Sequence, residues 1–407
     1  MVRILHTSDW HLGATLEGFS RDEEHRRFLE WLVNEIRAGG DDILVVAGDV
    51  FDQAQPSAEA QRAYYRFLTS LRSTGLRQVV IVGGNHDSPS RLEAPRDLLE
   101  TLRIHVVGGL AGDPDAWDRC LCRVQGDDGR ALAVVAAVPY VHECHLGIQT
   151  ALADEGVIRT SFQERVAALY RALADRAEQM GDGAPLMATG HLACVGIRPG
   201  DAPVEIHRIG SLDGLPPEVF DARFRHVALG HLHRLFRVKE SPAWYSGTPV
   251  PLGLAEAASP RQVLRVEIPD GAGEAVVTKV PVPLSRQVLE VAGTLDEVAG
   301  RLRQMEWDGD LPPYILARVR VDHYALGIET DVMAAAAARG PSGPVLVRVT
   351  QDRALSAMPG DSEPVQRSLR DLAPEEVFVD LCRDRGVGDD PDLMQAYRSL
   401  LAQEVEG

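Results

Sequence analysis

Five short apolar runs in the first 233 residues are each followed closely by a cluster of metal-binding side chains. The runs are rich in Val, Ile, Leu and Ala, which predicts buried strands at residues 2–5, 43–47, 79–82, 186–188 and 227–229. The clusters are Asp9-Trp10-His11, Gly48-Asp49-Val50-Phe51-Asp52, Gly84-Asn85-His86-Asp87, Gly190-His191 and Gly230-His231-Leu232-His233. Ligands collect at the carboxyl ends of strands in an open α/β sheet, so the five clusters can converge on one crevice.

The side chains of these clusters have the chemistry of a two-metal hydrolytic site. Asp, His and Asn together suit divalent transition metals such as Mn²⁺, Fe²⁺ or Zn²⁺, and a carboxylate can bridge two ions. Two cations roughly 3.5–4 Å apart lower the pKa of a bridging water and clamp a phosphate for in-line displacement. The glycine that precedes a cluster leaves room for a tight backbone turn. Because alternate residues of an extended segment share a face, Asp9 and His11 are expected to point the same way, as are His231 and His233.

The pattern between and after these clusters predicts the domain organisation. Residues 22–38 and 57–73 have apolar positions at helical spacing, which gives a β-α-β-α-β order at the start of the chain. The character changes near residue 281. Strands are expected at 286–292, 313–321 and 344–350, and helices at 295–306 and 328–338, which together make a small α+β domain. A polar stretch at 356–365 precedes two candidate helices at 374–385 and 390–404.

Composition narrows the class of protein. With 407 residues, two or three domains are expected, and no run approaches 18 uninterrupted apolar residues, so no membrane span is expected. The start of the chain has no basic-then-apolar signal pattern, and the five scattered cysteines lack a Cys-x-x-Cys pair, so a reducing cytoplasm is expected. The net charge of −18 is unfavourable for binding nucleic acid. Residues 1–255 hold 26 basic and 34 acidic side chains, several of them candidate ligands, so charge neither supports nor excludes DNA.

In the order in which they occur, the clusters resemble the calcineurin-like metallophosphoesterase superfamily. The segments 4–13, 48–52, 228–233 and 246–252 narrow the resemblance to its DNA double-strand-break repair nuclease branch. The match is dense to about residue 255, and beyond residue 280 it rests on the layout of elements. The resemblance implies an α/β sandwich of two sheets flanked by helices over residues 1–280, an α+β cap domain at 281–355, and a linker with C-terminal helices for an ATPase partner at 356–407.

The resemblance also implies the ligands. A first ligand set comprises Asp9, His11, Asp49 and His233, and a second comprises Asp49, Asn85, His191 and His231, with Asp49 as the bridge. His86 is then the proton donor to the leaving oxygen, and Asp87 is expected to orient its ring. Two divalent ions are expected, Mn²⁺ before Mg²⁺ or Fe²⁺.

Other residues near the clusters have two interpretations each. Asp52 either helps to place the substrate or is a carboxylate at a helix N-terminus. Arg21, Arg26 and Arg62, with their neighbours Arg27 and Arg66, are candidates for backbone-phosphate contacts as a group, although each alone fits a solvated helix face. Trp10 is interpreted as a packing residue, with base stacking as the alternative. Six histidines outside the clusters are interpreted as ordinary: His6, His25, His105, His207, His226 and His323.

The leading hypothesis is a DNA nuclease subunit that acts on DNA ends and hairpins, as exonuclease and endonuclease, in repair or recombination. The alternative is a small-molecule or cyclic-nucleotide phosphodiesterase, because a metal site does not name its substrate. The C-terminal 125 residues favour the nuclease, and the complete ligand set disfavours a non-catalytic scaffold.

The chain lacks the Gly-x-x-x-x-Gly-Lys-Ser/Thr pattern, so ATP-driven work requires another subunit. The resemblance implies an SMC-like coiled-coil ATPase and a homodimer within a heterotetramer. The apolar stripes of 374–385 and 390–404 suit docking to a coiled coil, with packing on the cap domain as the alternative.

Overall fold

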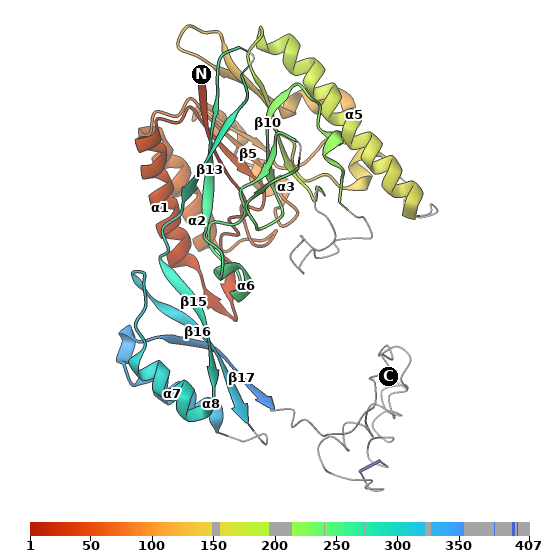
Figure 1. The fold of residues 1–407 in the computed structure, drawn as a ribbon. Helices are drawn as coiled ribbons and strands as arrows, with labels where there is room; N and C mark the ends of the chain where they lie inside the picture. The colour runs from red at the N-terminus through yellow and green to blue at the C-terminus, as the bar shows by residue number, and fades with distance from the viewer. Residues whose placement is uncertain are drawn as a thin grey trace. The chain divides into compact units, whose positions relative to one another are not determined.

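Two six-stranded β-sheets lie face to face in the computed structural model of this chain (Figure 1). The first sheet has the order β14-β13-β1-β4-β5-β6, and the second has the order β11-β12-β10-β9-β8-β7. Strands β1, β4, β5 and β6 are parallel, as are β8, β9, β10 and β12, whereas the edge strands of each sheet include antiparallel pairs. The strands of the first sheet are β1 Val2–Thr7, β4 Ile43–Ala47, β5 Gln78–Val82, β6 Ile104–Val107, β13 Gln262–Ile268 and β14 Val276–Pro281. Those of the second are β7 Leu121–Gln125, β8 Ala131–Ala136, β9 Leu186–His191, β10 Phe224–Gly230, β11 Phe236–Arg237 and β12 Ala243–Tyr245.

The structure describes residues 1–148, 155–194, 214–239, 241–271, 273–321 and 327–353, together with Phe378, Leu393, Met394 and Tyr397. The chain divides into two compact units, Met1–Ala354 and Leu355–Gly407. Within the described part, no helix is long and apolar enough to cross a membrane.

Helices cover the outer faces of both sheets, as predicted. Figure 1 shows α1 (Asp22–Gly39) and α2 (Ala58–Ser70) beside the first sheet and α5 (Glu155–Gly181) on the other side of the sandwich. Strand β4 explains why the predicted runs are continuously apolar: Ile43 and Val45 face the core between the sheets, and Leu44 and Val46 face the core under α1 and α2. The shorter elements of this part are β2 Thr15–Leu16, β3 Phe19–Ser20, α3 Pro89–Glu93, α4 Arg96–Thr101 and α6 Leu254–Ala257.

A third, three-stranded sheet follows the sandwich. Parallel strands β15 (Arg286–Gly293), β16 (Leu311–Val321) and β17 (Val345–Arg353) pack against α7 (Leu295–Gln304) and α8 (Ile328–Ala337) around a hydrophobic core of their own. Thr294 and Glu297 form a capping box at the start of α7. These elements agree with those expected between residues 286 and 350, and a cap domain with the bounds 281–355 stays a prediction.

The two predicted C-terminal helices lie almost entirely outside the described residues. The four described positions in this region, Phe378, Leu393, Met394 and Tyr397, are all helical. The rings of Phe378 and Tyr397 stack with their centroids 3.9 Å apart. Phe378, from the first predicted helix, therefore contacts Tyr397, from the second.

Candidate metal centre

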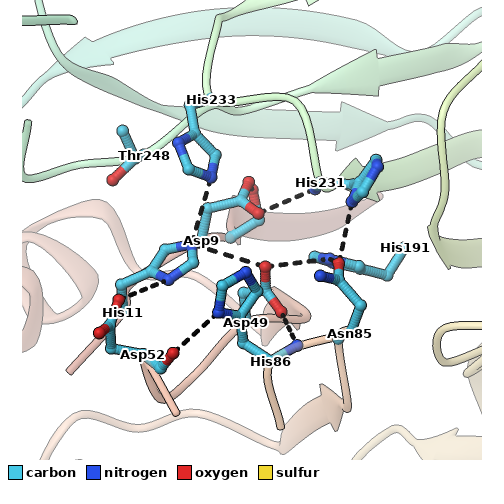
Figure 2. Close-up of polar contacts among 12 residues, drawn as sticks. Asp9, His11, Asp49, Asp52, Asn85, His86, His191, His231, His233 and Thr248 are labelled. Atoms are coloured by element: carbon cyan, nitrogen blue, oxygen red, sulfur yellow. Dashed lines mark hydrogen bonds and ion pairs between the residues drawn. The ribbon is translucent and has the colours of Figure 1, made fainter. Parts of the chain in front are cut away.

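The five predicted clusters meet at one place, beyond the carboxyl ends of strands from both sheets (Figure 2). Asp9 follows β1, Asp49 follows β4 and Asn85 follows β5, whereas His191 ends β9 and His231 follows β10. Backbone hydrogen bonds continue past the ends of the first two strands, since the amide of Asp9 donates to the carbonyl of Gly48 and that of His11 to the carbonyl of Asp49, both at 3.0 Å. The loops that carry the ligands are therefore fixed to each other as well as to the sheets.

The backbone at several ligands is left-handed rather than extended. The φ angles of Asp9, His11 and Asp49 are 51°, 48° and 48°, and that of His231 is 95°. The left-handed region costs a non-glycine residue roughly 1–2 kcal/mol, and such residues concentrate at functional sites. The expectation that Asp9 and His11, or His231 and His233, share the face of an extended segment is therefore wrong. Sharp loop turns aim these side chains.

The glycines before the clusters are required by close approaches at the site. A Cβ atom on Gly84 would lie 2.1 Å from Oδ1 of Asp49, and one on Gly48 would lie 2.1 Å from Nδ1 of His191. Gly48 also has a φ of 89°, which L side chains rarely adopt. The prediction that these glycines make room for crowded turns is confirmed.

The first ligand set converges on one point. Asp9, His11, Asp49 and His233 each offer a ligand atom, and these four atoms lie within 4.8 Å of one another. The Nε2 atoms of His11 and His233 are 3.2 Å apart, and Oδ2 of Asp49 is 3.5 Å from Nε2 of His11. Two carboxylates and two imidazole nitrogens in this space have the donor chemistry of a transition-metal site.

The second ligand set lies on the other side of Asp49. Oδ1 of Asn85 is 3.0 Å from Nε2 of His191 and 3.0 Å from Nδ1 of His231. Oδ2 of Asp49 is 3.3 Å from Nε2 of His191. The same oxygen atom thus faces one histidine of each set, which is the position that a bridging carboxylate requires.

The charges of these groups depend on each other. Burial raises the pKa of Asp49, but the charges of His191 and His11 outweigh it and hold that pKa below its usual range. Burial lowers the pKa of His191, but Asp49 outweighs it and raises the pKa to about 9. Burial lowers the pKa of His231 to about 4. Because a metal binds the deprotonated imidazole, loading of the second set must release the proton from His191.

Two of the four ligand histidines have the second ring nitrogen held by a hydrogen bond to an oxygen atom, and in a third a carboxylate oxygen lies close to that nitrogen. Nδ1 of His191 donates to the carbonyl of Ala47 at 2.9 Å, and Nδ1 of His233 to Oε1 of Glu256 at 2.7 Å. Nδ1 of His11 lies 3.3 Å from Oδ1 of Asp52. In each case Nε2 is left to face the other ligands, and such partners set the orientation and basicity of a ligand imidazole.

This arrangement changes the interpretation of Asp52 and adds Glu256. Asp52 is not at a helix N-terminus, since α2 begins at Ala58 with Ser57 as its cap, and its carboxylate lies beside His11. Sequence reasoning missed Glu256, which follows the ligands in a stretch with no metal-binding pattern.

His86 is held by Asp49 and by the main chain of Asp52 rather than by Asp87. Its amide donates to Oδ1 of Asp49 at 2.9 Å, and its Nδ1 donates to the carbonyl of Asp52 at 2.8 Å. Its ring meets that of His11 edge to face, with the centroids 4.9 Å apart. The side chain therefore lies at the edge of the first ligand set.

The expected pairing of Asp87 with His86 is wrong. The Asp87 carboxylate is buried and accepts hydrogen bonds from the amides of Val50, Phe51 and Gly84 at 2.8 to 3.0 Å. Burial, and then the charge of Asp49, raise the pKa of Asp87 to about 6. Asp87 thus joins the loops after β4 and β5, and it supports the site without touching the His86 ring in the described contacts.

The predicted DNA-contacting arginines differ in position. Arg21 is 0% exposed and pairs with Glu24 at 2.8 Å, so its assignment to DNA contact is wrong. Arg26 is exposed on α1 and pairs with Glu23 and Glu30, and Arg62 is exposed on α2 near Glu59. For these two, phosphate contact stays a prediction.

Trp10 is a packing residue, as predicted. Its side chain is fully buried, and its Nε1 donates to Oγ1 of Thr7 at 3.0 Å. Its ring meets Phe28 and Phe67 edge to face. Base stacking by Trp10 is excluded, because no face of the ring reaches solvent.

The α/β sandwich and the convergent ligands define a metal-dependent phosphoesterase. Residues 2–235 match the family model described as calcineurin-like phosphoesterase. The chain is 34% identical over 391 residues to the SbcD component of nuclease SbcCD from Rhodobacter capsulatus, with 93% of this chain and 94% of the relative covered. It is 31% identical over 384 residues to the corresponding SbcCD component of Escherichia coli K12, with 93% and 92% covered. With that of Bacillus subtilis it shares 32% identity over 275 residues, 66% of this chain and 67% of the relative. The chain belongs to the SbcD family of nuclease subunits.

Proposed function

We propose that this chain is a two-metal DNA nuclease subunit that hydrolyses phosphodiester bonds at DNA ends and hairpins, as exonuclease and endonuclease, in DNA repair and recombination. The observation that carries the proposal is the position of Asp49, whose Oδ2 lies 3.5 Å from His11 and 3.3 Å from His191, one histidine of each ligand set. Seven side chains from five strand ends surround this point: Asp9, His11, Asp49, Asn85, His191, His231 and His233.

These residues fit a pair of divalent ions, and Mn²⁺ is the proposed metal. When bound, such ions supply Lewis acidity, which activates water and neutralises charge on the phosphate. The first set holds two carboxylates, whereas the second holds Asn85 in place of one of them. The two ion sites therefore differ in charge, with the first more anionic.

His86 is proposed to give a proton to the leaving oxygen. Because its Nδ1 donates to the carbonyl of Asp52, the proton that it transfers is carried on Nε2. After the transfer the ring is neutral, with Nδ1 still protonated and still bonded to the same carbonyl. The orientation of the ring is therefore the same before and after the step, and only its charge changes.

The partner is proposed to be an SbcC-like SMC ATPase. The relatives are named as components of the nuclease SbcCD, and this chain has no P-loop pattern of its own. The apolar positions of 374–385 and 390–404 are the proposed docking segments. We further propose that two copies of this chain form a homodimer within a heterotetramer, which works in the cytoplasm.

Digestion of DNA beside small esters tests the nuclease. End-labelled linear duplex and hairpin DNA are incubated with the full chain and Mn²⁺, in parallel with a cyclic nucleotide and bis-p-nitrophenyl phosphate. We expect cleavage of both DNA substrates, with no cleavage by Asp49→Ala. Turnover of the small esters without any cut DNA would overturn the nuclease and favour a small-molecule phosphodiesterase.

Deletion of residues 365–407 tests the partner. Every proposed ligand lies before residue 234, so the truncated chain should still cut simple DNA ends with Mn²⁺. It should lose co-purification with the ATPase, and with it any stimulation by ATP. Binding of undiminished affinity would place the docking site elsewhere.

A further inference from the structure

Helix α6 places a carboxylate behind one of the proposed metal ligands. Oε1 of Glu256 lies 2.7 Å from Nδ1 of His233, and its Oε2 accepts a hydrogen bond from the amide of Leu252 at 2.7 Å. The side chain is 20% exposed. Both oxygens are therefore used, one on the ligand histidine and one on the backbone of the loop before α6, so the carboxylate has little freedom to turn away.

The backbones of Glu256 and His233 are joined by a second residue. The guanidinium of Arg261 donates through Nη1 to the carbonyl of His233 at 3.2 Å and through Nη2 to the carbonyl of Glu256. Its Nε donates to the carbonyl of Ser259 at 3.0 Å. Arg261 thus fixes the separation of the two main chains whose side chains meet at Nδ1 of His233.

Helix α6 is held on its other side by apolar contacts. Leu254 and Ala257 pack against a hydrophobic cluster that contains residues of β2, β15 and β16: Leu16, Val288, Tyr314 and Leu316. A helix of only four residues has little stability of its own, so this packing is what fixes its position. Glu256 is accordingly carried on a supported element rather than on a free loop.

We propose that Glu256 is a positioning residue for His233, which it holds with Nε2 directed into the first ligand set. The inference rests on the metal-dependent function proposed above. A carboxylate that accepts the Nδ1 proton fixes the tautomer and the ring angle, and it makes the other nitrogen a stronger donor to a cation. Without this hydrogen bond the His233 ring can rotate, and Nε2 then no longer keeps the direction that a metal of the first set requires.

The partners of the ligand histidines differ between the two sets. In the first set, His11 and His233 lie beside the carboxylates of Asp52 and Glu256. In the second set, Nδ1 of His191 donates to the neutral carbonyl of Ala47, whereas Nδ1 of His231 faces Asn85, a proposed ligand of the same ion. Removal of Glu256 should therefore lower the affinity for the ion of the first set and leave the affinity for the ion of the second set nearly unchanged.

Titration of the metal-free full chain with Mn²⁺, followed by calorimetry and by the electron paramagnetic resonance of free Mn²⁺, measures both sites without reference to activity. We expect two sites in the wild-type chain. In Glu256→Ala one of them should weaken by about 10–100-fold, the effect typical of losing such a partner. Glu256→Gln should recover part of that loss, because the amide oxygen still accepts the Nδ1 proton but carries no charge.

Glu93 offers a matched control. Its side chain is 21% exposed, and its Oε1 accepts hydrogen bonds from the amide of Gly108 and from Arg119. Glu93→Ala should therefore show the cost of losing a half-buried structural carboxylate, with both Mn²⁺ affinities unchanged. Thermal unfolding of each variant, measured without metal, records that cost separately.

Three results would overturn the positioning role. These are wild-type affinities at both sites in Glu256→Ala, an equal loss at both sites, or the same change in Glu93→Ala. If Glu256→Ala does not fold, an unweakened first site in Glu256→Gln is the overturning result. Failure of the wild-type chain to bind Mn²⁺ or to cut DNA would instead count against the proposed function itself, so the two failures are distinguishable.

Discussion

Strands β1 and β10 each carry one histidine within the strand and another five residues later, and the two kinds have different surroundings. His6 and His226 lie between the two sheets, fully buried, with their ring centroids 5.6 Å apart. His11 and His231 lie just beyond the ends of the same strands, among the proposed metal ligands. The residue type and the strand are the same, so the position relative to the end of the strand makes the difference.

The polar surroundings of the two pairs explain the difference. Nε2 of His6 lies 3.1 Å from the carbonyl of Leu229, and Nε2 of His226 has no hydrogen-bond partner in the described part of the chain. Burial lowers the pKa of His6 to about 4 and that of His226 well below its ordinary value, so both are neutral packing groups. His11 and His231 face carboxylate and amide oxygens instead. Ligand histidines need such oxygens, which the interior of the sandwich does not supply.

Asp49→Ala should have the largest effect. The carboxylate faces both ligand sets, so its loss should deplete both ions and lower DNA cleavage by more than the about 10²–10⁴-fold typical of losing a general acid. Asn85→Ala is the matched variant, because it removes a neutral ligand from one set only. Metal analysis of the purified proteins decides the point: equal metal loss in the two variants would contradict the bridge.

His86→Ala should lower DNA cleavage by about 10²–10⁴-fold while both ions stay bound, because it removes a proton donor and no ligand. The rate is measured with excess Mn²⁺, and the metal content is measured in the same preparation. His86 lies close to the proposed ligand His11, so the metal content of this variant tests whether His86 is also a ligand. A protein that also lost metal would place His86 among the ligands.

Asp52→Ala should lower the affinity for the ion of the first set by about 10–100-fold, because it removes the carboxylate beside Nδ1 of His11. The carbonyl of residue 52 is retained, so the orientation of His86 should not change. Mn²⁺ titration and the KM for DNA are measured together. Unchanged metal affinity with a raised KM would return Asp52 to the role of substrate placement.

The parts of the molecule that could be predicted from the sequence are those fixed by local pattern. An apolar run such as 43–47 followed by Asp49 predicts both a strand and a ligand at its end, because the strand itself brings the ligand to the edge of the sheet. The left-handed backbone at Asp9, His11 and Asp49 could not be predicted in this way, since it depends on the crowding of five loops.

Residues whose roles depend on distant partners were interpreted wrongly or missed. Arg21 stands beside a helix and has the character of a solvated residue, but Arg286 and Tyr314, more than 260 residues later, cover it and Glu24. Asp87 follows His86 directly, yet its carboxylate accepts hydrogen bonds from three backbone amides in the loops after β4 and β5. Glu256 acquires its role only because α6 folds back onto His233.

The smallest expected effect concerns the buried pair and the pH dependence of stability. His6 and His226 have pKa values lowered in the folded chain, whereas in the unfolded chain a histidine titrates near its ordinary value of 6.5. Below pH 6.5 the unfolded state therefore binds more protons than the folded state. The stability associated with each neutral histidine is fully present above that pH, and it is lost as the pH falls toward the folded value, which for His6 is about 4.

His226→Leu should remove one of these two contributions and leave the metal centre intact. Each buried histidine changes the free energy of unfolding by about 1.4 kcal/mol per pH unit in this window, so the dependence of the variant should be shallower than that of the wild-type chain by about that amount. Urea unfolding of the metal-free proteins between pH 7 and pH 5 measures the difference, because the titration of the ligand histidines is common to both. Mn²⁺ binding at neutral pH should be the same in the two proteins. A parallel pH dependence, or a loss of Mn²⁺ binding in His226→Leu, would show that a histidine inside the strand and one beyond its end do not have separate roles.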